Sequence, residues 1–211
     1  MKQIWKGMVL AASVTLAPTV QAGVLVPMSE EREVGDTLDY DALVVVYSLT
    51  DLENVSDDLI GYSVGITRSV YDDIFIGVSY QQGSADLQAG EPIPNAVATS
   101  LDSSTIVLGG GFHMQVRPRM DAIFNVSWVS ARQETQFKID DTGIAAGVGL
   151  RHRVRTDFEY SAALRHIRVF DASDTYVAVE GGYYLTRDLQ ATLSIDSADD
   201  RTIALGLQFF Y

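Results

Sequence analysis

Polar and apolar residues alternate with a period of two along most of this chain. Near the C-terminus, Ile203, Leu205, Leu207 and Phe209 are each separated by one polar or small residue. This is the period of a β-strand with two unlike faces, and no segment shows a convincing helical period. The pattern predicts an all-β protein with ten strands, at about residues 39–50, 59–70, 74–87, 104–117, 121–135, 141–154, 157–170, 175–185, 189–196 and 201–211.

The connections between these strands differ in length. The turns at 71–73, 118–120, 155–156 and 186–188 are tight, whereas the polar connections at 51–58, 88–103, 136–140, 171–174 and 197–200 are longer. Short turns at one end and longer loops at the other are typical of a bacterial transmembrane barrel, with the short turns in the periplasm. We predict a closed antiparallel up-and-down barrel of ten strands over residues 39–211, with eight strands as the alternative.

The two faces of the strands differ in chemistry. One face carries Ile, Leu, Val, Phe and Tyr, and the other carries Gly, Ser, Thr, Gln and Arg. The second face is too small and polar to pack a dry core, which predicts that the apolar face contacts lipid. A soluble β-sandwich is the alternative. We expect lipid contact for Val126, Leu150, Leu193, Leu205 and Leu207, and lumen positions for Ser127, Gly147, Gly149 and Thr192.

The N-terminus has the three parts of a secretory signal peptide. Lys2 and Lys6 precede a short apolar stretch at residues 8–16, and Val20-Gln21-Ala22 fits a cleavage site. The apolar stretch is too short for a membrane anchor, which needs about 20 residues. We predict Sec-type export, cleavage near Ala22, and a short periplasmic segment at residues 23–38.

The charge of the chain excludes some partners. The formal net charge is −13, and the predicted signal contains two lysines and no acid. Such an acidic surface repels phosphates, so we expect no nucleic acid. There is no cysteine, which excludes disulfides and thiol chemistry.

The end of the chain carries a family resemblance. The sequence runs Gly-Tyr-Tyr-Leu-Thr-Arg-Asp-Leu at 182–189, Ser-Ala-Asp-Asp at 197–200 and Ala-Leu-Gly-Leu-Gln-Phe-Phe-Tyr at 204–211. It resembles the last hairpin of the small outer-membrane barrels related to opacity-type porins and OmpA-like transmembrane barrels. The resemblance implies a monomer in contact with outer-membrane lipids and lipopolysaccharide. It also implies recognition by the barrel-assembly machinery through Phe209 and Tyr211, where Tyr211 replaces the commoner Phe.

A search for catalytic patterns gives no enzyme. The three histidines, His113, His152 and His166, are followed two positions later by Gln115, Val154 and Arg168, so the His-x-Ser arrangement of lipid A deacylases is missing. The Asp-x-His of omptin-like proteases, metal-ligand spacing and a phosphate loop are missing too. We therefore predict a non-enzymatic protein without metal or cofactor.

Charged residues on the inner face are the candidate functional residues. Glu180 and Arg165 are predicted to face inward on adjacent strands, and a symmetric loop at 171–174 would place them opposite each other. Arg151, Arg153 and Glu159 are predicted to face inward closer to the periplasm. Because a charge on a low-dielectric wall needs a partner, we expect internal ion pairs, acting as a polar plug or as a gate. The predicted function is a narrow, side-chain-filled barrel for envelope structure or surface interaction; the alternative is a small porin-like channel for ions or very small solutes.

Overall fold

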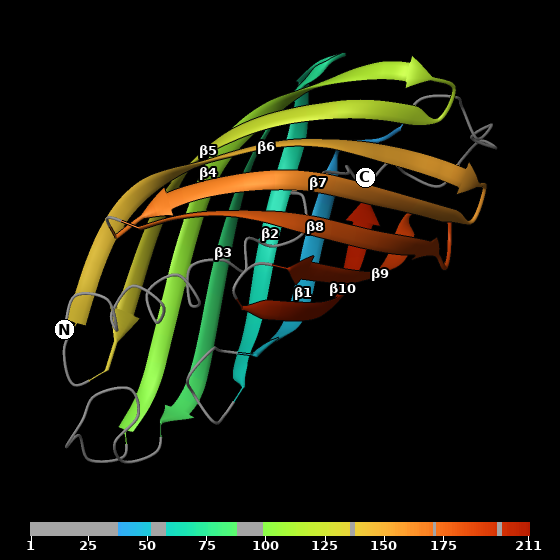
Figure 1. The fold of residues 1–211 in the computed structure, drawn as a ribbon. Helices are drawn as coiled ribbons and strands as arrows, with labels where there is room; N and C mark the ends of the chain where they lie inside the picture. The colour runs from blue at the N-terminus through green and yellow to red at the C-terminus, as the bar shows by residue number, and fades with distance from the viewer. Residues whose placement is uncertain (1–37, 52–57, 88–98, 136–137, 171, 198–199) are drawn as a thin grey trace.

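The described residues form ten antiparallel strands that close into one barrel (Figure 1). A computed structural model of the chain describes residues 38–51, 58–87, 99–135, 138–170, 172–197 and 200–211. No helix among them is long and apolar enough to cross a bilayer. The strands are β1 (Ala42–Asp51), β2 (Leu59–Tyr71), β3 (Ile74–Leu87), β4 (Thr99–Arg117), β5 (Met120–Glu134), β6 (Lys138–Arg155), β7 (Phe158–Val169), β8 (Ala172–Tyr184), β9 (Leu189–Ser197) and β10 (Arg201–Phe210).

Each strand pairs with the next along the chain, and β1 pairs with β10 to close the ring. The closing register runs from Ala42 opposite Phe210 to Asp51 opposite Arg201. The prediction of a ten-stranded up-and-down barrel is confirmed, and the eight-stranded and sandwich alternatives are wrong. Closure removes the free strand edges that an open sheet would expose.

Four strand starts differ from the sequence prediction by three residues or more. β1 begins at Ala42 because residues 39 and 40 leave the wall, whereas β4 and β6 begin earlier, at Thr99 and Lys138. The start of β4 was missed because Ser100, Asp102 and Ser104 on its outer side are polar, so alternation disappears there. β8 also begins earlier, at Ala172, so that only residues 170 and 171 separate it from β7.

The outer face carries a belt of large apolar side chains. Val126 and Leu205, for example, are 64% and 60% exposed. Thr192 is buried on the inner face, and Ser127, Gly147 and Gly149 share that face by alternation. The predicted orientation of the faces is therefore confirmed along the middle of the barrel.

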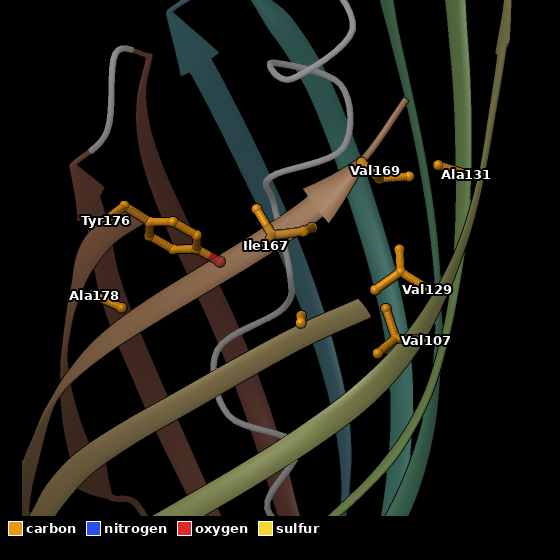
Figure 2. Close-up of a cluster of buried hydrophobic side chains, with 8 residues drawn as sticks. Val107, Val129, Ala131, Ile167, Val169, Tyr176 and Ala178 are labelled. Carbon is orange, nitrogen blue, oxygen red and sulfur yellow. The ribbon is translucent and has the colours of Figure 1, made fainter. Parts of the chain in front are cut away.

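The inner face is not polar throughout. Toward the loop end, eight inward side chains form a buried apolar cluster, part of which is labelled in Figure 2: Val107, Val129, Ala131, Ala145, Ile167, Val169, Tyr176 and Ala178. We call this the upper apolar cluster. On β7 the inward Ile167 and Val169 of this cluster alternate with the outward, exposed His166 and Arg168. Apolar side chains therefore point inward and polar ones outward there, which is the reverse of the arrangement along the middle of the barrel. The expectation of an inner face too small and polar to pack a dry core is therefore wrong at this level of the barrel. Beyond the apolar belt, the outer face carries the polar side chains and the inner face carries the apolar ones.

Candidate functional site

Residues 38–40 turn from the start of β1 into the lumen at the short-turn end of the barrel. Leu38 and Tyr40 are almost fully buried and pack in one apolar cluster with Phe75 of β3 and Ile123 of β5. We call residues 38–40 the crossing segment. The side-chain carboxylate of Asp41 accepts a hydrogen bond from the backbone N–H of Ser69, which fixes the chain where it leaves the wall. Leu38, expected in a periplasmic tail, thus lies inside the barrel.

Tyr40 is the centre of the crossing segment. Its ring stacks on His113 of β4, with 3.9 Å between ring centroids, and on Phe75 at 5.4 Å. Its hydroxyl donates a hydrogen bond of 2.7 Å to the Asp121 carboxylate on β5, 81 positions away. Asp121 in turn lies 3.3 Å from Nδ1 of His113. Tyr40 belongs to no strand, yet these contacts fix it to β4 and β5, on the other side of the lumen from β1.

Arg151 of β6 makes the second connection to the crossing segment. Its Nη1 donates a 2.5 Å hydrogen bond to the backbone carbonyl of Asp39, and its guanidinium carbon lies 5.2 Å from the centroid of the Tyr40 ring. Its Nε donates to Oε1 of Glu159 on β7 at 2.9 Å, and its Nη2 lies 2.8 Å from the same oxygen. Arg151 is fully buried, so these contacts replace its hydration.

Glu159 carries the network on to the far strands. Its Oε2 accepts a 2.9 Å hydrogen bond from the Tyr184 hydroxyl of β8 and lies 3.6 Å from Nε of Arg153. Arg153 also donates to the Tyr184 hydroxyl at 2.5 Å, and Tyr184 stacks on Phe210 of β10 at 5.5 Å. One carboxylate thus serves two guanidinium groups and a phenol. With the crossing segment, these side chains form what we call the short-turn network, which extends from β1 across the lumen and around to β10.

The structure brings Arg151, Arg153 and Glu159 together, and these three were predicted to face inward near the periplasm. It places the other two candidates differently. Arg165 is opposite Tyr176, and Glu180 is opposite Ser161. The register predicted for β7 and β8 is therefore wrong, because their turn is at residues 170–171 and not at 171–174.

The consequence is an offset between Arg165 and Glu180. Glu180 lies four positions beyond Tyr176, the partner of Arg165, which is about 13 Å along the strand. Its diagonal neighbour across the hairpin is Glu159, which pairs with Gly182. Arg165 and Glu180 both remain buried on the inner face, but they are not direct cross-strand partners.

Sequence reasoning missed the Tyr40–His113–Asp121 contact. Tyr40 had been assigned to a strand, and Asp121 is an ordinary residue next to a turn. The available signal was the alternation itself, since Tyr40 shares the inward phase of Ala42, Val44 and Val46 and is the only aromatic residue among these four positions.

A small cavity lies against the crossing segment. Its volume for water-sized molecules is about 40 Å³, and it is lined by Tyr40, Thr67, Phe75, Gly77, Val107, Gly109, Gly110, Ile123, Asn125 and Ser127. This is room for about two or three waters and not for an organic ligand. Within the described ranges, no three His, Asp or Glu side chains gather closely enough to hold a metal ion.

Solved structures with the same architecture are known. The NanC porin aligns with a TM-score of 0.52 and 8% identity over 80% of this chain and 100% of that one. The β domain of the Bordetella autotransporter BrkA aligns with a TM-score of 0.52 and 10% identity over 81% and 98%. This chain has the fold of an outer-membrane β-barrel. No family model and no curated protein sequence matches it.

The short-turn network and the upper apolar cluster lie toward opposite ends of the barrel. The chain ends at the short-turn end, where Phe209 is exposed on the outer face and Tyr211 lies just beyond β10.

Proposed function

We propose that this chain is a non-enzymatic outer-membrane barrel whose lumen is closed at its periplasmic end, and that it serves envelope structure or surface interaction. One observation carries the proposal. The crossing segment is bound across the lumen by the Tyr40–Asp121 hydrogen bond and by the Arg151 hydrogen bond to the Asp39 carbonyl. A water-filled channel would leave these groups apart and hydrated.

The chemistry of the network supports a structural role. The charges of Arg151 and Glu159 neutralise each other, and His113 is covered by the stacked Tyr40 ring. The cavity against the crossing segment is also too small to admit an organic substrate. The network therefore supports a plug more than a catalytic centre.

The proposal includes the cellular setting. The belt of exposed apolar side chains on the outer face supports contact with outer-membrane lipids and lipopolysaccharide, by a monomer. Phe209 and Tyr211 at the end of the chain support recognition by the barrel-assembly machinery. The signal peptide, its cleavage near Ala22 and Sec-type export are proposed from residues 1–22, which lie outside the described residues.

A small porin-like channel is the second candidate. The position of the crossing segment before β1 favours this candidate. The segment can leave the lumen without breaking the pairing of β1 with β2 or β10. In that case the short-turn network is a gate for ions or very small solutes.

Single-channel conductance in planar bilayers separates the two functions. We expect the wild-type protein to show little conductance and Tyr40→Ala to raise it, because the substitution removes the ring stack and the bond to Asp121. Tyr62→Ala is the matched control, since Tyr62 is an outward tyrosine that is 56% exposed. Open steps in the wild-type protein as large as those of Tyr40→Ala would favour the channel.

A further inference from the structure

We propose that Arg168 and His166, on the outward face of β7, bind a phosphate group of an anionic membrane lipid at the loop end of the barrel. The inference rests on the proposed outer-membrane setting, in which the short turns face the periplasm and the loop end lies in the outer leaflet. The lipid is then lipopolysaccharide, and the inference names the place on the barrel that holds its headgroup.

Three successive rows of outward side chains on β6, β7 and β8 show where this site lies relative to the apolar belt. The first row is apolar, and its exposed fractions are 45%, 50% and 49% for Val148, Leu164 and Val177. The next row toward the loop end is Ala146, His166 and Thr175, and the row after it is Ile144, Arg168 and Ser173. Arg168 and His166 therefore stand at the edge of the belt, at the depth where lipid headgroups meet acyl chains.

The charge of Arg168 is not balanced by the residues that face it in the sheet. Its directly opposite residues are Ile144 on β6 and Ser173 on β8, and neither is charged. Three other outward cations at this end have acids opposite them: Arg132 pairs with Asp140 at 2.5 Å, Lys138 lies opposite Glu134, and Arg201 lies opposite Asp51. An anion from outside the chain can therefore pair with Arg168 without displacing a cross-strand acid.

His166 and two hydroxyl groups add further hydrogen-bond donors beside this guanidinium group. Nδ1 of His166 lies 2.7 Å from the Thr175 hydroxyl. When that hydroxyl donates to Nδ1, the neutral ring carries its proton on Nε2, which becomes a donor. His166 and Arg168 are two positions apart on one face of β7, about 7 Å along the strand. One phosphate group can bridge two long side chains at this spacing, and the Ser173 hydroxyl lies on the same face.

The surrounding surface favours a lipid over a soluble polyanion. The chain has a formal net charge of −13, and Asp86, Asp102 and Glu134 are exposed on the outward faces of β3, β4 and β5. These charges repel a polyanion that approaches from water. A lipid is instead held in the membrane plane by its acyl chains, next to Leu164 and Val177, so one local cation is enough to select its phosphate.

Binding of lipopolysaccharide to the folded protein in a neutral detergent tests the site. The titration contains EDTA, so that divalent cations do not connect acidic side chains with phosphates. We expect Arg168→Ala to raise the apparent Kd at least about tenfold, because it removes a charge-assisted hydrogen bond. Arg132→Ala is the matched control, an outward arginine of the same rim that is paired with Asp140, and it should change the Kd by less than about twofold.

Two further arms identify the ligand chemistry. Arg168→Lys should give a Kd between those of the wild-type protein and Arg168→Ala, because lysine keeps the charge but lacks the planar fork. Dephosphorylated lipopolysaccharide should bind the wild-type protein and Arg168→Ala alike. Inorganic phosphate at millimolar concentration should not displace the lipid, because it lacks the acyl chains. Displacement by inorganic phosphate would show a site for a free anion and would overturn the commitment to a lipid.

The folding of each variant is checked by its shift on an unheated gel, which keeps a loss of binding distinct from a loss of fold. Equal Kd values for Arg168→Ala and Arg132→Ala, or equal binding of both lipids by the wild-type protein, would overturn the phosphate site alone. If the wild-type protein binds neither lipid, the proposed contact with the outer leaflet fails as well. The closed lumen is decided separately, by the conductance of the wild-type protein and Tyr40→Ala.

Discussion

At the scale of single residues, Glu159 is the acceptor on which the short-turn network depends. Arg151, Arg153 and Tyr184 all direct a polar group at its carboxylate, from two strands. Burying a charge is costly unless it is paired and hydrogen-bonded, so removing the shared acceptor leaves two guanidinium groups without their anion. The other inward pair of opposite charges, Arg165 and Glu180, is offset along the hairpin.

Two double-mutant cycles compare these pairs. Glu159→Gln should lower the free energy of unfolding by about 3–5 kcal/mol, because it leaves buried cations uncompensated. In the cycle of Glu159→Gln with Arg151→Met we expect a coupling energy of about 1–3 kcal/mol. The cycle of Glu180→Gln with Arg165→Met should give a smaller coupling energy, as measured by urea unfolding in vesicles. Equal coupling in both cycles would contradict the observed register.

The sequence indicated the inward side of Arg151, Arg153 and Glu159 because alternation assigns each residue of a strand to a face. It did not indicate which of them meet, because pairing depends on the register between strands. One shorter turn, at residues 170–171, moved Glu180 from Arg165 to Ser161. Alternation gives Tyr40 an inward phase, but the residue it meets across the lumen, Asp121, depends on how the whole ring of strands closes.

At the scale of elements, the backbones of β6 and β7 are in close contact at Gly143 and Arg168. A Cβ added at Gly143 of β6 would lie 1.9 Å from the carbonyl oxygen of Arg168 on β7 and 2.9 Å from its carbonyl carbon. Both are main-chain atoms, which cannot rotate away as a side chain does. The turn that follows β7 is also tight, since Phe170 has a φ of 54° and its N–H is bound by the Asp141 carboxylate. Only glycine fits this contact without separating the strands.

Gly143→Ala should therefore lower the free energy of unfolding by about 1–3 kcal/mol through overpacking. Gly181→Ala is the control on β8, because the nearest atoms to its added Cβ belong to the Phe158 ring at 3.8 Å. Alanine there should be neutral or should stabilise by about 0.5–1 kcal/mol, since glycine is unfavourable within a strand. A larger loss of stability at 181 than at 143, in the same unfolding assay, would show that this contact does not limit the packing of β6 on β7.

At the scale of the whole molecule, the outer belt and the closed ring follow from alternation and strand number, and both were predictable. The strands are long and their outward residues are apolar in the middle of the barrel, so a closed cylinder with a lipid-facing surface satisfies every backbone group. The upper apolar cluster was not predictable from alternation alone. Alternation assigns the residues of a strand to two faces, but beyond the lipid-facing belt the apolar face is the inner one. The sequence contains this exchange of the apolar and polar faces. The positions of the strand ends in the structure are needed to see where along the strands it occurs.

A charged side chain introduced among the outward residues tests which levels of the barrel lie in the hydrocarbon layer. Leu205→Arg, at the middle outward position of β10, should lower the stability in a bilayer by about 2–4 kcal/mol, because arginine is costly near the midplane. Ser100→Arg, outward at the outer end of β4, should change it by about 0–1 kcal/mol. Refolding yields into vesicles across a urea series give both values. A similar loss at the two sites would mean that β4 does not extend beyond the hydrocarbon layer.

The crossing segment also has a consequence for the order of folding. Tyr40 and Asp121 are separated by 81 positions, so their hydrogen bond closes a long loop and forms only after the first five strands have curved toward each other. Interactions that are absent from the folding transition state slow unfolding and leave the folding rate unchanged. The crossing segment would then contribute chiefly to the lifetime of the folded barrel and little to the rate at which the barrel forms.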